Sequence, residues 1–170
     1  CTFPSSSAVP LEYDNNGICS GCQTSNQRLN IDWSRREKLF LDLIEQYKSK
    51  NNYYDCLIPV SGGKDSTYQV IKILQLGLNP LCVCATTCDL SDLGRYNLEN
   101  LRNLGVDLIE VSTNPRIRSK LNRIGLEMVG DISWPEHVSI FTAPVKFALA
   151  YDIPLILWGE IFTFKKSPIF

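Results

Sequence analysis

The sequence predicts an α/β protein built on a doubly wound parallel sheet. Short apolar runs alternate along the chain with stretches of helical periodicity, which is the pattern of βαβ units. These runs are apolar at nearly every residue rather than at alternate ones, as expected of strands buried on both faces. With 170 residues, 44% of them hydrophobic, the chain is long enough for one such domain with a sizeable core.

A polar segment precedes the first expected helix. Residues 1–31 are rich in Ser, Asn, Pro and Gly without a sustained period, which predicts a loop-rich N-terminal segment. The main domain is predicted to cover residues 32–170, and Asp32 is the expected N-cap of a helix that runs to about Lys50. The apolar positions at helical spacing in this helix are Leu39, Phe40, Leu43, Ile44 and Tyr47.

Strands and helices are then expected in strict alternation. Residues 53–60 are predicted to form a buried strand, and residues 66–76 a helix stopped by Gly77. The later elements are expected as a strand at 79–89, a helix at 93–104, a strand at 106–112, helices at 115–128 and 140–151, and a fourth strand at 153–160. This order predicts a parallel sheet covered by helices.

Composition limits the kinds of partner that the protein is expected to bind and indicates the cellular compartment in which it works. Seventeen basic and eighteen acidic residues leave a net charge of -1, which provides no overall field to attract nucleic acid or a membrane surface. No apolar run approaches the roughly 20 residues of a transmembrane helix, and no signal-peptide pattern is present. An odd count of seven cysteines in a chain of this length favours a cytoplasmic protein with metal-bound or buried thiols.

The segment SGGKDS, residues 61–66, follows the first strand and opens the next helix. In open α/β sheets ligands bind at this place, where glycines let the backbone approach a ligand and the helix start attracts an anion. Lys64 adds a positive charge, Ser61 and Ser66 add hydroxyl donors, and Asp65 beside a phosphate indicates Mg²⁺. The Walker motif is excluded, because Ile58 stands where that motif needs glycine. An ordinary strand-to-helix turn is the structural alternative.

The SGGKDS loop resembles the PP-loop of the N-type ATP pyrophosphatases, which cleave ATP between the α- and β-phosphates. Further stretches resemble the N-acetyl sugar amidotransferases within that superfamily, over roughly residues 1–160. They are NGICSGC, YDCLIPVSGGKDSTYQV, GLNPLCV, NLENLRNLGVDLIE and WPEHVSIFTAPVKFALAYDIPLILWGE. The resemblance implies an enzyme of lipopolysaccharide or other surface-polysaccharide biosynthesis. Such an enzyme adenylates the acetamido group of a nucleotide-linked sugar acid and converts it to an acetamidino group with ammonia from a partner glutaminase.

The resemblance also implies roles for individual residues. Ser61, Gly62, Gly63, Lys64, Asp65 and Ser66 would bind the pyrophosphate of ATP with Mg²⁺, and Lys64, Asp65 and Ser66 would act in catalysis. Residues 85–87 and Asp89 would border the adenosine, and Gly159 and Glu160 would close the crevice. His137, the only histidine, would contact the substrate or act in acid–base chemistry.

The cysteines divide into three groups. Cys19 and Cys22 form a C-x-x-C, and in the resembling family Cys1 would belong to a second one, which implies a structural Zn²⁺ in a zinc knuckle. A redox pair is the alternative, but such a pair normally opens a helix in a βαβ unit, which is not expected here; incidental thiols are a third reading. Cys56, Cys82 and Cys84 are predicted to be buried hydrophobes, whereas Cys88 follows the second strand at its ligand-facing end.

The resemblance ends near residue 160, before the tail IFTFKKSPIF, and together with the start at Cys1 this predicts a chain truncated at both ends. Ser133 and Glu136 flank Trp134-Pro135 at positions where the family often has cysteines. Two alternative functions stay open: a PP-loop tRNA-modifying enzyme such as a thiouridylase, which needs a basic surface for RNA, and a non-catalytic nucleotide-binding fragment. No glutaminase pattern is present in the chain itself.

Overall fold

The computed structural model describes residues 11–49, 53–86 and 90–159. The chain divides into two compact units, Cys1–Glu45 and Gln46–Phe170, and each is described by itself. The division falls inside the second helix, and the domain boundary predicted at residue 32 stays a prediction. Because Thr87, Asp89, Glu160, Cys1 and Cys88 lie outside the described residues, the roles expected for them also stay predictions.

The first unit contains a helix that the sequence did not predict. Helix α1 (Ser20–Leu29) lies within the segment expected to be loop-rich, and Cys19 is its N-cap. The C-x-x-C thus opens a helix, but, as expected, the helix is not part of a βαβ unit. The periodicity gave no sign of α1 because none of its residues is buried. Local hydrogen bonds hold its start instead: Asp14 Oδ1 accepts the backbone N–H of Ile18 at 2.8 Å, and Ser20 donates to the Glu12 carbonyl at 2.7 Å.

Helix α2 (Trp33–Tyr47) confirms the helix expected after Asp32. The Asp32 carboxylate accepts the backbone N–H of Arg35 at 2.9 Å and so caps the helix as predicted. Its apolar face is less buried than expected. Ile44 is the only buried residue of α2, and each of the other four residues expected on that face is more than a third exposed.

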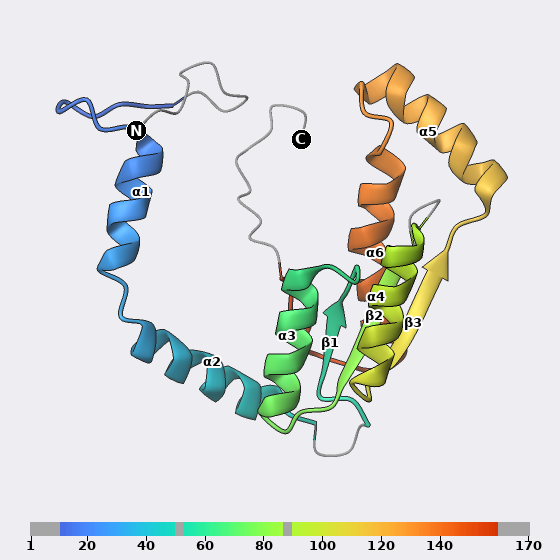
Figure 1. The fold of residues 1–170 in the computed structure, drawn as a ribbon, viewed down its shortest axis with the longest axis horizontal. Helices are drawn as coiled ribbons and strands as arrows, with labels where there is room; N and C mark the ends of the chain where they lie inside the picture. Colours follow the sequence, from blue (N-terminus) through green and yellow to red (C-terminus); the bar gives the residue numbers. More distant parts are fainter. Residues whose placement is uncertain (1–10, 50–52, 87–89, 160–170) are drawn as a thin grey trace. The chain divides into compact units, whose positions relative to one another are not determined.

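The second unit is built on three parallel strands, β1 (Cys56–Pro59), β2 (Pro80–Thr86) and β3 (Asp107–Ser112), in the order β1-β2-β3 (Figure 1). Cys56 pairs with Pro80, and Leu81 pairs with Asp107. These three strands and their parallel pairing agree with the sequence prediction. β1 and β2 are buried almost throughout, whereas β3 is only partly buried, so it lacks the full cover that its apolar sequence indicated.

The fourth expected strand is reduced to one parallel bridge between Leu57 and Ile156. The Leu57 N–H donates to the Leu155 carbonyl, and the Leu157 N–H donates to the Leu57 carbonyl, both at 2.9 Å. This segment therefore lies on the edge of β1 opposite β2. The chain builds the sheet outward from β1 to β3 and then returns to the other side of β1, which is the strand reversal of a doubly wound sheet.

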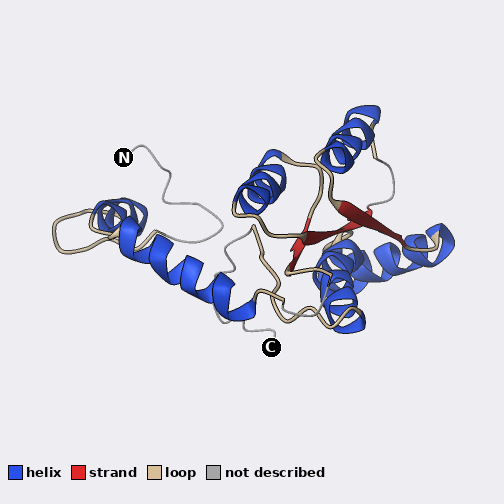
Figure 2. Cartoon of the chain, turned by 90° about the horizontal axis from the view of Figure 1, so that it is seen from below, coloured by secondary structure: helices blue, strands red, loops and turns tan. Residues whose placement is uncertain are grey.

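Four helices accompany this sheet: α3 (Lys64–Gln75), α4 (Asp92–Asn103), α5 (Pro115–Val129) and α6 (Trp134–Ala150). Helices lie on both sides of the sheet (Figure 2), as predicted. The largest difference is the start of α6, six residues before the expected Ile140. The sequence was interpreted as a rigid turn at Trp134-Pro135, but proline fits the first turn of a helix, where its missing N–H has no acceptor to lose.

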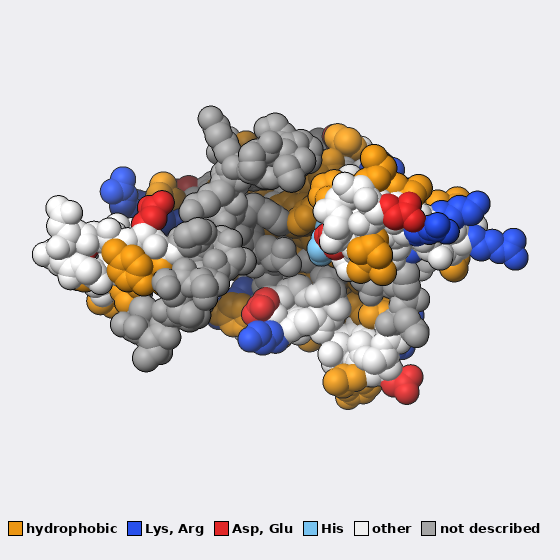
Figure 3. All heavy atoms as spheres, turned by 90° about the horizontal axis from the view of Figure 1, so that it is seen from above, with side chains coloured by type: hydrophobic (Ala, Val, Ile, Leu, Met, Phe, Trp, Pro, Cys, Tyr) orange, Lys and Arg blue, Asp and Glu red, His pale blue; other side chains and the backbone are white. Residues whose placement is uncertain are grey.

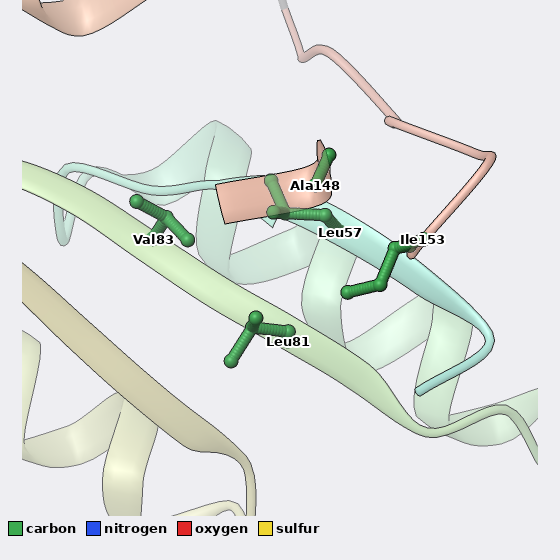
Figure 4. Packing of buried hydrophobic residues seen from close by; sticks show 5 residues of the cluster. All are labelled: Leu57, Leu81, Val83, Ala148 and Ile153. Atoms are coloured by element: carbon green, nitrogen blue, oxygen red, sulfur yellow. The ribbon is translucent and has the colours of Figure 1, made fainter. Parts of the chain in front are cut away.

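The hydrophobic core lies on both faces of β1 and β2. On one face Leu57, Leu81 and Val83 pack with Ala148 of α6 and Ile153 (Figure 4). On these strands the intervening thiols of Cys56, Cys82 and Cys84 are buried, as predicted. Burial raises the pKa of Cys56 and Cys82 to about 12 and that of Cys84 to about 11, so these thiols stay protonated and unreactive at neutral pH.

Within the described ranges, no helix combines the length and the apolar character needed to cross a membrane.

Candidate nucleotide-binding site

The candidate site lies where the sheet reverses its strand order, at the carboxyl end of β1. The loop of residues 61–66 leaves β1 there and turns into α3. Val60 is held to the neighbouring strand by donating its backbone N–H to the Val83 carbonyl at 2.9 Å. Open α/β sheets bind ligands in this crevice. The fold therefore brings the predicted loop to the place where a ligand is expected.

The loop is folded back on itself by its own hydroxyl groups. Ser61 Oγ accepts the N–H of Gly63 at 3.4 Å, and Ser66 Oγ donates to the Gly63 carbonyl at 3.2 Å. Thr67 Oγ1 donates to the same carbonyl at 2.9 Å. These bonds fix the path of the backbone around the start of α3, so that the loop is shaped before any ligand arrives.

The N-terminus of α3 is open to an anion. Gly63 is its N-cap and provides no side-chain hydrogen bond, whereas Ser91 caps α4 and Asn114 caps α5 with side-chain oxygens. The first N–H groups of a helix have no acceptor within the helix and carry its positive partial charge. A phosphate group is well suited to accept them.

Gly62 serves the packing of the loop against α4, and its expected role in binding pyrophosphate stays a prediction. Its φ is +74°, a conformation that favours glycine, and its residue is buried. A Cβ atom at this position would lie 3.2 Å from Asn97 Cβ and 3.4 Å from Leu98 Cδ2. The loop therefore lies directly against α4, with no room for a side chain.

A cavity of about 240 Å³ opens beside the loop. The predicted residues that line it are Ser61, Gly63, Asp65, Ser66 and Gly159, together with Ala85 and Thr86 at the end of β2. Gly159 approaches α3 so closely that a Cβ would lie 3.2 Å from Gln69 Oε1. Lys64 and Gly62 are not among the lining residues, and Lys64 is an exposed side chain in the first turn of α3.

The apolar wall of this cavity includes residues that the sequence did not single out. Leu90, Ile140 and Trp158 line it, and the Trp158 ring packs against Phe141 with ring centroids 5.6 Å apart. Trp158 could have been suspected from its place beside Gly159. Ile140 carries no local signal, because α6 reaches the site only through the tertiary fold.

His137 stands apart from this cavity. It lies in the first turns of α6, its side chain is 55% exposed, and its Nδ1 is 3.5 Å from Asp131 Oδ2. It does not line the cavity at the 61–66 loop. Its substrate-contacting role stays a prediction.

The residues at the loop fit Mg²⁺ bound together with a phosphate. In residues 11–49, 53–86 and 90–159, no three His, Cys, Asp or Glu side chains form a group that could hold a metal ion alone. Mg²⁺ in phosphate sites, however, is commonly held by one or two carboxylates plus the phosphates of the substrate. Asp65 provides one carboxylate at the cavity, next to the hydroxyls of Ser61 and Ser66.

Cys19 and Cys22 would provide two of the four ligands of the predicted zinc site. Cys19 is buried, and its Sγ accepts the N–H of Cys22 at 3.4 Å. Hydrogen bonds from the Cys22 backbone and thiol lower the pKa of Cys19, which favours the thiolate form that binds metal. The pairing with Cys19, together with burial, raises the pKa of Cys22. Structural zinc needs four ligands, so zinc binding stays a prediction.

Comparisons with known proteins give no family for the chain. No family model matches the chain. An uncharacterized protein of Methanocaldococcus jannaschii is 27% identical over 106 residues, which are 61% of this chain and 36% of that protein. The chain thus corresponds to about a third of the length of this relative. A crystal structure of a predicted subunit of a tRNA methyltransferase from the same organism matches with a TM-score of 0.40 and 18% identity, covering 65% of this chain and 55% of that one.

Fold and site together define a class. The parallel sheet has helices on both faces and reverses its strand order at β1, where the glycine-containing loop lies. These features make this an α/β fold of the nucleotide-binding type.

Proposed function

We propose that the chain binds ATP at the 61–66 loop and uses it to adenylate an amide oxygen. One observation carries the proposal: the uncapped N-terminus of α3, the loop hydroxyls and the Asp65 carboxylate all border a single cavity with an apolar wall. A nucleotide has the same two parts, a charged polyphosphate and an apolar base. The loop end suits the phosphates, and the wall of Leu90, Ile140 and Trp158 suits the adenine.

The resemblance of the 61–66 loop to the PP-loop supports cleavage between the α- and β-phosphates. The pyrophosphate end of ATP would accept hydrogen bonds from the N–H groups of the α3 N-terminus and from the hydroxyl of Ser61, because the Ser66 hydroxyl already donates to the Gly63 carbonyl. These donors are already in place, so they stabilise the negative charge that develops on the leaving pyrophosphate. Asp65 would hold Mg²⁺, which supplies further neutralisation of the phosphate charge.

The reaction balances as two displacements. The amide oxygen of the acceptor attacks the α-phosphorus, the bond from this phosphorus to the bridging oxygen breaks, and pyrophosphate leaves. Ammonia then attacks the amide carbon, and AMP leaves with the former amide oxygen, so that nitrogen replaces oxygen. An amide oxygen is a poor leaving group by itself, which is why the activation requires ATP.

The acceptor we propose is a nucleotide-linked N-acetyl sugar acid, and the ammonia source is a partner glutaminase. The support is the resemblance of several segments, among them residues 97–110, in α4 and β3, and residues 134–160, which include α6. The second segment borders the site, because Ile140 and Gly159 line the cavity, and Asn97 and Leu98 of the first segment lie against Gly62 of the loop.

Isotope transfer tests the proposal. The chain is incubated with ATP, Mg²⁺, ammonium and nucleotide-linked N-acetyl sugar acids whose acetyl oxygen is ¹⁸O. We expect AMP that contains ¹⁸O and a product in which NH has replaced O, both identified by mass spectrometry. Release of ADP, or of AMP without the label, would contradict adenylation of the amide.

Two matched variants locate the activity. Asp65 and Asp92 are exposed acidic residues in the first turns of α3 and α4, respectively. Asp65→Asn is expected to lower AMP formation at least tenfold, because charge stabilisation at a phosphate site is typically worth more than about 1.4 kcal/mol. Asp92→Asn is expected to leave it unchanged. Equal rates in the two variants would place the reaction elsewhere.

A further inference from the structure

A second and larger cavity of about 660 Å³ lies at the carboxyl ends of β2 and β3. Its lining residues are Thr86, Ser112, Thr113, Pro115, Arg118, Ser119, Asn122, Arg123, Leu126 and Ile132. Thr86 also lines the cavity at the 61–66 loop, so the two cavities share this residue at the end of β2. Its hydroxyl is 3.0 Å from both the Val111 carbonyl and Ser112 Oγ, which fixes this shared wall.

A buried arginine borders the second cavity. Arg118 is 3% exposed, and its Nη2 donates to Thr113 Oγ1 at 2.6 Å and to Ser139 Oγ at 3.3 Å. Among the described residues, its Nε and Nη1 have no hydrogen-bond partner. Glu136 Oε1 lies 3.6 Å from Nη1, close enough for an ion pair but too far for a hydrogen bond. A buried guanidinium with unused donors is costly to the folded chain and favours an anionic ligand.

The residues around Arg118 also favour a negatively charged ligand. Among the described residues, the lining includes two arginines, Arg118 and Arg123, and no carboxylate. Glu136 Oε1 lies 3.6 Å from Arg118 Nη1, and Arg123 pairs with Glu127 at 2.7 Å. The N-terminus of α5, with Pro115 in its first turn, also lines the cavity and adds the positive end of a 15-residue helix. Figure 3 shows Lys and Arg side chains gathered over α5, at the right of the view.

We infer that this second cavity binds the carboxylate of the acceptor substrate, with Arg118 as its cationic partner. The class of acceptor, a nucleotide-linked sugar acid, rests on the proposed function. The positions of the two cavities suggest how the substrates would be arranged. ATP at the 61–66 loop and the carboxylate at Arg118 would lie on either side of Thr86, and the acetamido group between them would face the α-phosphate. Arginine suits this task because its planar guanidinium matches a carboxylate.

Paired ligands test the inference. The probes are a UDP-linked N-acetylhexosaminuronic acid and the corresponding UDP-linked N-acetylhexosamine, which differ only in a carboxylate against a CH₂OH group. Each is titrated by calorimetry into the chain saturated with α,β-methylene-ATP and Mg²⁺. The acid is expected to bind about ten- to a hundredfold more tightly, the range of hydrogen bonds to charged groups.

The variants are chosen to keep the chain folded. Arg118→Gln combined with Glu136→Gln removes both members of the buried ion pair and leaves no unpaired charge. This double variant is expected to lose the preference for the acid. Ser119→Asp changes only an exposed lining residue and is expected to weaken the binding of the sugar acid more than that of the neutral sugar. Arg116→Gln, an exposed cation of α5 outside the lining, is the control and should keep the preference.

Separate outcomes address the two proposals. The assignment of Arg118 would be overturned if the two sugars bound equally or if neither bound. It would also be overturned if the preference for the acid survived both the double variant and Ser119→Asp. A titration with α,β-methylene-ATP alone tests the nucleotide site independently. Failure of that titration contradicts the proposed function, whereas nucleotide binding without an acid preference contradicts only the inference about the second cavity.

Discussion

The close approach of the 61–66 loop to α4 leads to a stability prediction for Gly62→Ala. The alanine must adopt the φ of +74° found for Gly62, which costs roughly 1–2 kcal/mol for a residue with a side chain. Its Cβ must also fit 3.2 Å from Asn97 Cβ and 3.4 Å from Leu98 Cδ2, and overpacking of this kind adds about 1 kcal/mol or more. We therefore expect the free energy of unfolding to fall by about 2–3 kcal/mol.

Gly77 provides the matched control. Its φ is +72°, almost that of Gly62, but a Cβ at this position would meet no atom of the described residues within 4 Å. Gly77→Ala should therefore show the conformational cost alone, about 1–2 kcal/mol. Urea unfolding followed by circular dichroism measures both variants. Equal losses of stability would refute the tight packing of the loop on α4, and a loss larger for Gly77→Ala would contradict the described loop geometry altogether.

Three further predictions concern the edges of the site and the core. Gly159→Val should weaken ATP binding at least tenfold, because the new side chain forces the segment around residue 159 away from Gln69. Calorimetry measures the affinity, and an unchanged value would show that this segment does not close the cavity. Burial acts to raise the pKa of Glu110, but hydrogen bonds from two arginines of α4 outweigh it and lower the pKa overall. This pairing stabilises the fold at any pH above the pKa that Glu110 has in the unfolded chain, and the stabilisation is lost as the pH falls through the lower pKa of the folded chain. Glu110→Gln should therefore lower the free energy of unfolding by up to about 1 kcal/mol at neutral pH and not at all in acid. A difference that stays constant across pH would contradict this prediction. The thiols of β1 and β2, with pKa values of about 11 to 12, should react with a disulfide reagent only after unfolding, and rapid reaction in the native chain would contradict their burial.

The sequence indicated those parts of the fold that leave a short-range pattern. Strands β1 and β2 were predictable because they are apolar throughout, and the 61–66 loop because its glycines, serines and charges directly follow a strand. Helix α1 left no pattern, since it buries none of its residues and is held by local caps. The early start of α6 was missed because Pro135 was interpreted as part of a turn.

The site was predictable only where its residues are local to the loop. Ser61, Asp65 and Ser66 line the cavity as expected, but Lys64 does not. Ile140 reaches the same cavity from a helix some seventy-five residues further along the chain, a juxtaposition that comes only from the tertiary fold. Arg118 was missed for the same reason, because in the sequence it is one of several basic residues on an amphipathic helix.

Nuclear magnetic resonance tests the central claim, that the 61–66 loop holds the phosphates of ATP. The backbone amides of the ¹⁵N-labelled chain are followed while pyrophosphate, adenosine or ATP is added with Mg²⁺. Pyrophosphate should shift the amides of residues 61–66, adenosine should shift those of Ala85, Thr86 and Trp158, and ATP should shift both sets. ATP that shifts neither set, or pyrophosphate that acts only at amides far from the loop, would contradict the account.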